Sequence, residues 1–157
     1  MQTRSIAHYT RRGPGGLTGK AVSLTLAGGI VFWVSTVATS LLPIAAAYRA
    51  ALSNWSVQSV WLGSLIAGIL IACCISFLLL RRSRGTPAKR PMLKPLALSS
   101  GFLVLATVII DVPKCFQGFG DVLAYFLIGF LFNFARFLLM GTAIGLRYKQ
   151  LQKKVPE

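Results

Sequence analysis

Arg136 is the residue whose type and position most strongly suggest chemistry in this sequence. It lies in the apolar stretch 122–146, which contains no other charged residue. At 1.5 Å per residue, this stretch is long enough to cross the roughly 30 Å hydrocarbon core of a bilayer. A guanidinium group at that depth is costly, so it normally faces protein, water or an anion. The sequence therefore predicts a specific partner for Arg136.

Asp111 is the carboxylate that we expect to pair with Arg136. In a bundle of alternating helices, Arg136 lies about 15 Å from the cytoplasmic end of its helix and Asp111 about 22 Å from the same end. Each side chain leans toward the N-terminus of its own helix, so the two lean toward each other. Asp121 is about 22 Å from Arg136 along the helix, which is beyond direct reach.

Other polar residues share the faces of this pair. Tyr125 and Asn133 fall on the side of Arg136, and Thr107 falls on the side of Asp111. Two interpretations follow. In one, a buried bridge fixes how the third and fourth helices dock, with Asn133 and Thr107 satisfying the remaining donors and acceptors. In the other, the pair lines a cavity in which Arg136 receives an anion.

The composition predicts the elements that position these residues. Hydrophobic residues make up 55% of the chain and charged residues only 13%, which is unlike a soluble domain. Four apolar runs are near or above the length of a spanning helix. We therefore expect an all-α membrane protein with four transmembrane helices in an up-down bundle. The expected domain is 21–146, with helices at about 21–48, 60–80, 96–112 and 122–146.

The distribution of charge predicts the orientation of the bundle. The net charge is +14, and the basic residues gather in the flexible tail 1–20, the connection 81–94 and the tail 147–157. The other two connections carry only Arg49 and Lys114 as basic residues. This alternation indicates that the N- and C-termini are both cytoplasmic. The connection 81–94 is expected to bind anionic lipid headgroups and not nucleic acid.

The first apolar run has an alternative interpretation as a signal peptide. Pro43 and the alanines at 45–47 resemble a small-residue cleavage site. The apolar part exceeds the roughly 7–15 residues of a signal core, so we expect a retained helix.

Small residues predict where helices approach closely. The first run carries a small, hydroxyl-bearing side suited to helix contact: Gly28, Gly29, Ser35, Thr36, Thr39 and Ser40. In the second run, small residues recur at every fourth position: Ser64, Gly68, Ala72 and Ser76. In the last run, one side is expected to face lipid, or a second copy through its two glycines: Phe126, Phe130, Phe134, Phe137, Gly141 and Gly145.

The residues needed for common catalytic chemistry are missing from the apolar runs. They hold no histidine, no nucleophile–base pair and no carboxylate cluster, so we expect neither an enzyme nor a metal or cofactor site. Cys73, Cys74 and Cys115 form no C-x-x-C motif.

Two functions fit these expectations. The first is a small non-catalytic scaffold or accessory subunit that binds other membrane proteins or a second copy of itself. The second is a small oligomeric transporter or flippase for an anionic or lipid-linked substrate, with Arg136 as the anion-binding residue. In either case the expected location is an integral position in a membrane, specifically a prokaryotic cytoplasmic membrane.

Overall fold

The computed structural model describes residues 16–52, 56–82, 92–112 and 122–153. Every element in these ranges is a helix. Some side chains within the helices are outside the description, among them those of Asp111 and Tyr125. In chain order the elements are α1 (Leu17–Ser40), α2 (Pro43–Leu52), α3 (Val57–Arg82), α4 (Leu93–Ala106), the π-helix η1 (Thr107–Asp111) and α6 (Val122–Lys153).

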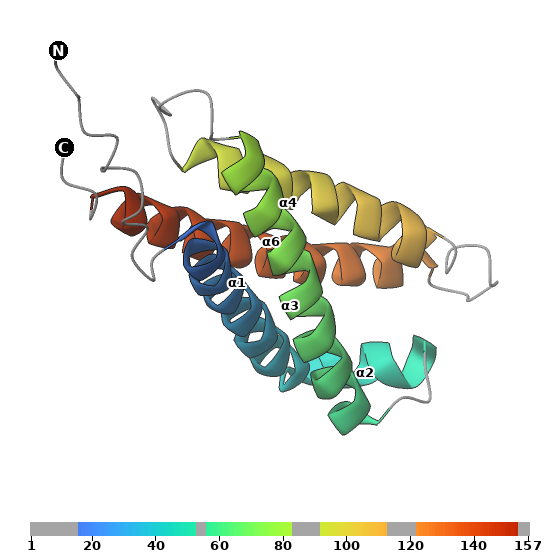
Figure 1. Cartoon of the computed structure of the whole chain (residues 1–157). Coiled ribbons are helices and arrows are strands. Elements are labelled where there is room, and N and C mark those ends of the chain that lie inside the picture. The colour runs from blue at the N-terminus through green and yellow to red at the C-terminus, as the bar shows by residue number, and fades with distance from the viewer. Residues whose placement is uncertain (1–15, 53–55, 83–91, 113–121, 154–157) are drawn as a thin grey trace, which may run out of the picture.

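The first expected helix, 21–48, is in fact two helices. α1 ends at Ser40, and α2 begins at Pro43. Proline has no N–H to donate and disfavours helical geometry in the residue before it, so the helix ends ahead of Pro43. Because proline suits the first helical position, a new helix starts at the same residue. Figure 1 shows α2 leaving α1 and α3 at a wide angle.

Both outer helices extend into segments that were expected to be tails. α1 already begins at Leu17, inside the expected tail 1–20. α6 continues past 146 to Lys153, because the added residues are good helix formers and Tyr148 is buried. Leu151 packs against the core one turn further along. The residues 1–15 and 154–157 of the expected tails lie outside the described ranges.

The third expected helix changes geometry part-way along. α4 begins at Leu93 with Pro95 in its first turn, where a missing N–H costs nothing. From Thr107 the backbone widens into η1, and the N–H of Val112 donates to the carbonyl oxygen of Thr107. Such π-helical turns are rare and occur often at functional sites.

The long helices form two antiparallel hairpins that cross at a wide angle. One hairpin is α1 with α3, and the other is α4 with α6 (Figure 1). α1 packs extensively against both α3 and α6, whereas α3 touches α4 and α6 only lightly. The hairpins come together at one end of the bundle, which we call the basic end. Its described basic side chains are Lys20, Arg81, Arg82, Lys94, Arg147 and Lys149.

Glycines allow α1 and α3 to approach closely. A methyl group on Gly68 would lie 2.8 Å from Phe32 Cδ1 and 3.3 Å from the Gly29 carbonyl oxygen. A methyl group on Gly29 would lie 3.2 Å from the Cα atom of Ile69. Backbone therefore meets backbone at this crossing, as is typical of small-xxx-small contacts in membranes.

The outside of the bundle is more apolar than a water-facing surface would be. The exposed stripe of α1 consists of Val22, Leu26, Ile30 and Val34, each about half exposed. The buried set, by contrast, includes the hydroxyl residues Ser35, Thr36, Ser40, Ser76 and Ser99.

Among the described residues, three helices are long and apolar enough to cross a membrane: Leu17–Ser40, Val57–Arg82 and Phe126–Gln152. The shorter apolar helix is Leu93–Ile109. The described part of the chain is thus an all-helical bundle whose apolar exterior suits a membrane.

Candidate functional site

Arg136 joins the two hairpins through a hydroxyl group of α1. Its Nη2 atom donates a hydrogen bond to Thr39 Oγ1 over 2.8 Å. The same hydroxyl donates to the carbonyl oxygens of Ser35 and Thr36, at 2.9 and 3.1 Å. Because its proton points into α1, the lone pairs of Thr39 Oγ1 are available for the guanidinium. Arg136 is half-buried, and its Nε atom is fully buried.

The Arg136 side chain runs along α1, away from the basic end. The neighbouring Phe137 packs edge-on against Phe32, with ring centroids 5.5 Å apart. The guanidinium reaches Thr39 instead, and the spacing from Phe32 to Thr39 corresponds to about 10 Å of helix. Thr39 is the residue before the last of α1. The charged group therefore lies near the far end of α1, as expected for an arginine whose long stem carries its head toward an interface.

A tryptophan marks the same level of the bundle. Trp61 Nε1 donates to Ser40 Oγ over 2.8 Å, and Ser40 Oγ donates to the Val37 carbonyl oxygen over 2.7 Å. Tryptophan side chains favour the membrane–water interface. The hydroxyls of Thr39 and Ser40 in α1 thus accept hydrogen bonds from Arg136 of α6 and from Trp61 of α3, respectively. We call Thr39, Ser40, Trp61 and Arg136 the hydroxyl clamp.

The hydroxyl clamp was only partly foreseen from the sequence. The hydroxyl-bearing side of the first helix was expected to make helix contacts, and it does so: Ser35, Thr36 and Ser40 are buried. Thr39 was not expected to bind Arg136. The signal was present in the hydroxyl residues that precede Pro43 in the first apolar run and in the length of the arginine side chain.

The expected pair of Arg136 with Asp111 stays a prediction. Asp111 ends η1, and its side chain is outside the described residues, as is that of Tyr125. Thr107 begins η1, and its Oγ1 atom is buried without a hydrogen-bond partner in the described part of the chain. Asn133 lies half-buried in α6, one turn before Arg136.

Gly141 and Gly145 do not face lipid or a second copy, as had been expected for their side of α6. A methyl group on Gly141 would lie 2.7 Å from Ser99 Oγ of α4. One on Gly145 would lie 3.7 Å from Cγ of Pro95. The expectation is wrong because α4 packs against this half of α6, where the glycines leave room. Nearer the start of α6, the side chains on this face are partly exposed, and Phe126, Phe130 and Phe134 stack in a row.

Two of the small residues of α3, Gly68 and Ala72, face α1. Gly68 and Ala72 are buried there, and Ala72 Cβ would be 3.1 Å from a methyl group on Gly28. Ser64 is half-buried and donates to the Trp61 carbonyl oxygen within its own helix over 2.9 Å.

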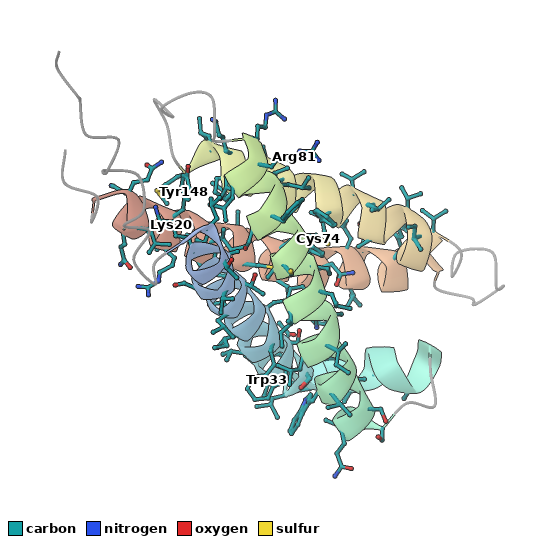
Figure 2. The ribbon with its side chains drawn as sticks, in the orientation of Figure 1. Lys20, Trp33, Cys74, Arg81 and Tyr148 are labelled. Atoms are coloured by element: carbon teal, nitrogen blue, oxygen red, sulfur yellow. The ribbon has the colours of Figure 1, made fainter. Side chains whose placement is uncertain are left out.

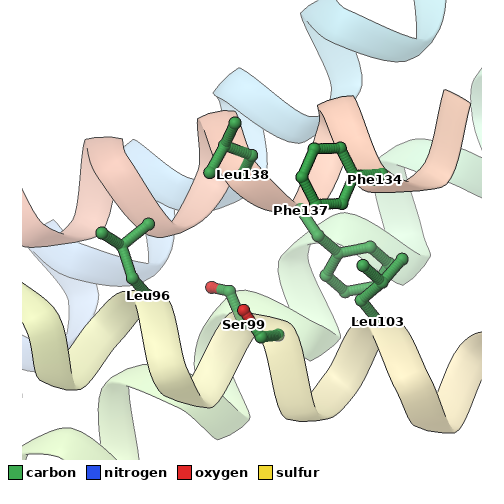
Figure 3. Close-up of a pocket in the computed structure, with 7 residues that line it drawn as sticks. Leu96, Ser99, Leu103, Phe134, Phe137 and Leu138 are labelled. Carbon is green, nitrogen blue, oxygen red and sulfur yellow. The ribbon is translucent and has the colours of Figure 1, made fainter. Parts of the chain in front are cut away.

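A small cavity lies between α4 and α6. Its volume is about 20 Å³, and Figure 3 shows Ser99 in its wall on α4, between Leu96 and Leu103. Ser99 is 1% exposed, and its Oγ atom has no hydrogen-bond partner in the residues that the structure covers. A volume of this size holds about one water molecule. It is too small for an organic anion or a lipid headgroup.

Among the described residues, the Arg136 guanidinium donates to one neutral hydroxyl, that of Thr39. In these residues, no group of three or more His, Cys, Asp or Glu side chains is placed to hold a metal ion. No protein-family model, curated protein or solved structure matches the chain. Function must therefore be inferred from the residues and their contacts.

Proposed function

We propose that this chain is a non-catalytic membrane scaffold or accessory subunit, and that Arg136 acts within it as a structural link. The observation that carries the proposal is the bond from Arg136 to Thr39. It ties the α4–α6 hairpin to the α1–α3 hairpin. A charge that holds helices together in an apolar environment favours a structural role, because bonds of this kind fix helix register.

The proposed scaffold crosses the membrane four times, with both termini in the cytoplasm. α4 and η1 together extend about 30 Å at 1.5 Å per residue, which is close to the thickness of a bilayer core. The basic end unites the start of α1, the end of α3, the start of α4 and the end of α6 (Figure 1). A concentration of positive charge at one end supports the cytoplasmic placement of that end. The expected prokaryotic cytoplasmic membrane belongs to the same proposal.

Outward-facing glycines on α3 and α4 support a role in binding other membrane helices. A methyl group on Gly63 or on Gly101 would meet nothing within 4 Å, and both residues are exposed. A helix of another membrane protein, or of a second copy, can approach closely at such positions. These two positions are therefore the proposed contact points for a partner.

Photocrosslinking tests the scaffold directly. A photoreactive amino acid is placed at Gly63 or at Gly101, and in the matched control at Leu26 on the exposed stripe of α1. The scaffold predicts discrete protein adducts, absent from the control, at one or both glycine positions. Adducts with lipid alone at all three positions would overturn it.

The transporter or flippase stays the second candidate because η1 contacts α6, the helix that carries Arg136. π-helical turns occur often at functional sites, and a charge within a membrane span is a functional candidate in its own right. The distinguishing variant is Arg136→Met, assayed in vesicles for movement of anionic solutes and lipids. The structural link predicts that Arg136→Met lowers stability and that wild-type vesicles show no flux above protein-free vesicles. Flux that is abolished by Arg136→Met in a stably folded protein would favour the transporter.

A further inference from the structure

Arg147 is an exposed cation that two neutral side chains hold in place. Its Nε atom donates to Ser23 Oγ of α1 over 2.8 Å, and its Nη1 atom donates to Gln150 Oε1 over 3.1 Å. A guanidinium group has five N–H donors in a rigid fork. Most of them are therefore not used by these two bonds, while the plane of the group is already oriented.

No described carboxylate neutralises Arg147. Asp111 is the one acidic residue within the described ranges, and it lies at the opposite end of the bundle, where η1 ends. Lys20 lies one helical turn before Ser23 on the same face of α1. Figure 2 shows Lys20 beside the α6 segment that carries Tyr148, the neighbour of Arg147. Positive charge thus collects at the junction of α1 and α6 without a described counter-ion.

Exposed apolar side chains adjoin this junction. Val22 and Leu26 are about half exposed on α1, and Leu146 is 49% exposed beside Arg147 on α6. A cationic group next to an apolar surface at the end of a spanning helix matches the two parts of a phospholipid. The phosphate can meet the guanidinium fork while the acyl chains lie on the apolar side chains.

We propose that Arg147, oriented by Ser23 and Gln150 and flanked by Lys20, binds the phosphodiester headgroup of an anionic phospholipid in the cytoplasmic leaflet. The leaflet assignment rests on the orientation proposed above, whereas the site itself does not. The site differs from the connection 81–94 because it depends on the positioning of one arginine and not only on the number of charges.

Binding is measured by native mass spectrometry in detergent, with phosphatidylglycerol and phosphatidylcholine of identical acyl chains as probes. The wild-type protein is expected to prefer phosphatidylglycerol. Arg147→Gln is expected to weaken phosphatidylglycerol binding by tenfold or more. The matched control Lys149→Gln removes one charge from the same helix end and is expected to weaken binding by at most about fivefold, the effect of one diffuse surface charge.

Ser23→Ala separates positioning from charge. It leaves the net charge unchanged but removes the acceptor that orients Arg147. We expect it to weaken phosphatidylglycerol binding several-fold, and circular dichroism without added lipid verifies that each variant is folded. If Ser23→Ala has no effect and Arg147→Gln equals Lys149→Gln, the basic end attracts lipid only diffusely and the proposal is overturned. Because detergent binding does not depend on orientation, this failure is distinct from a failure of the proposed topology.

Discussion

At the scale of single residues, the buried hydroxyl groups of this bundle differ in whether they have a hydrogen-bond partner among the described residues. Ser35 Oγ donates to the Val31 carbonyl oxygen over 2.6 Å, and Thr36 Oγ1 donates to that of Phe32 over 3.0 Å. Ser76 is 0% exposed, and its Oγ atom has no hydrogen-bond partner in the described part of the chain. Burying an unsatisfied hydroxyl is unfavourable, so Ser76 is expected to be a weak point of the core.

We predict that Ser76→Ala stabilises the protein. The change removes the buried hydroxyl and substitutes a better helix former, so the free energy of unfolding should rise by about 1 kcal/mol. Unfolding by SDS in mixed micelles measures the change. Ser35→Ala is the control, since it removes a hydroxyl whose hydrogen bond is complete, and it should not stabilise. A destabilised Ser76→Ala protein would mean that the hydroxyl has a partner.

At the scale of elements, the crossing of α1 and α3 depends on glycine. Gly68 lies against Phe32 and the Gly29 carbonyl oxygen, whereas Gly63 faces open space on the same helix. Both glycines lie in α3, and only Gly68 has close neighbours on another helix. The same substitution at the two positions therefore isolates the effect of the helix contact.

We predict that Gly68→Ala destabilises the protein and that Gly63→Ala does not. The added methyl group at Gly68 must displace Phe32 or separate the helices, which costs about 1–3 kcal/mol. At Gly63 the better helix propensity of alanine should stabilise by up to about 1 kcal/mol. The same SDS unfolding assay compares the two variants. Equal effects would show that the close contact does not contribute to stability.

Much of the element structure could be predicted from the sequence, because apolar runs and small-residue spacing are local signals. The break before Pro43 was missed because the apolar residues continue through it, although the proline is itself a local signal for a break. The side of α6 that carries Gly141 was misassigned because helical spacing groups residues on a face but does not say which neighbour covers it. The acceptor Thr39 was missed for a related reason. The helix crossing angle, which brings the far end of α1 to Arg136, is a property of tertiary packing.

At the scale of the whole molecule, the basic end organises the proposed topology. Gln58 lies near the start of α3, at the end opposite Arg81 and Arg82 of the same helix. Gln150 is exposed near the end of α6. The proposed arrangement places these two glutamines on opposite sides of the membrane.

We predict opposite labelling of cysteines placed at these positions. In a variant with Cys73, Cys74 and Cys115 replaced by alanine, Gln58→Cys should react with a membrane-impermeant maleimide in intact cells. Gln150→Cys should react only after the membrane is permeabilised. Labelling of both cysteines in intact cells, or of Gln150→Cys alone, would contradict four crossings with cytoplasmic termini.

The structural role of Arg136 is tested most directly by a double-mutant cycle with Thr39. Arg136→Met, Thr39→Val and the double variant are compared by SDS unfolding, with Thr142→Val as the control. Thr142 is suitable because its hydroxyl donates only within α6, to the Leu138 carbonyl oxygen.

We predict a coupling of about 1 kcal/mol between Arg136 and Thr39, as for interhelical hydrogen bonds in membranes. The effects of Arg136→Met and Thr142→Val should simply add. If the effects of Arg136→Met and Thr39→Val also add, the two side chains do not stabilise the bundle together, and Arg136 is not the link between the hairpins.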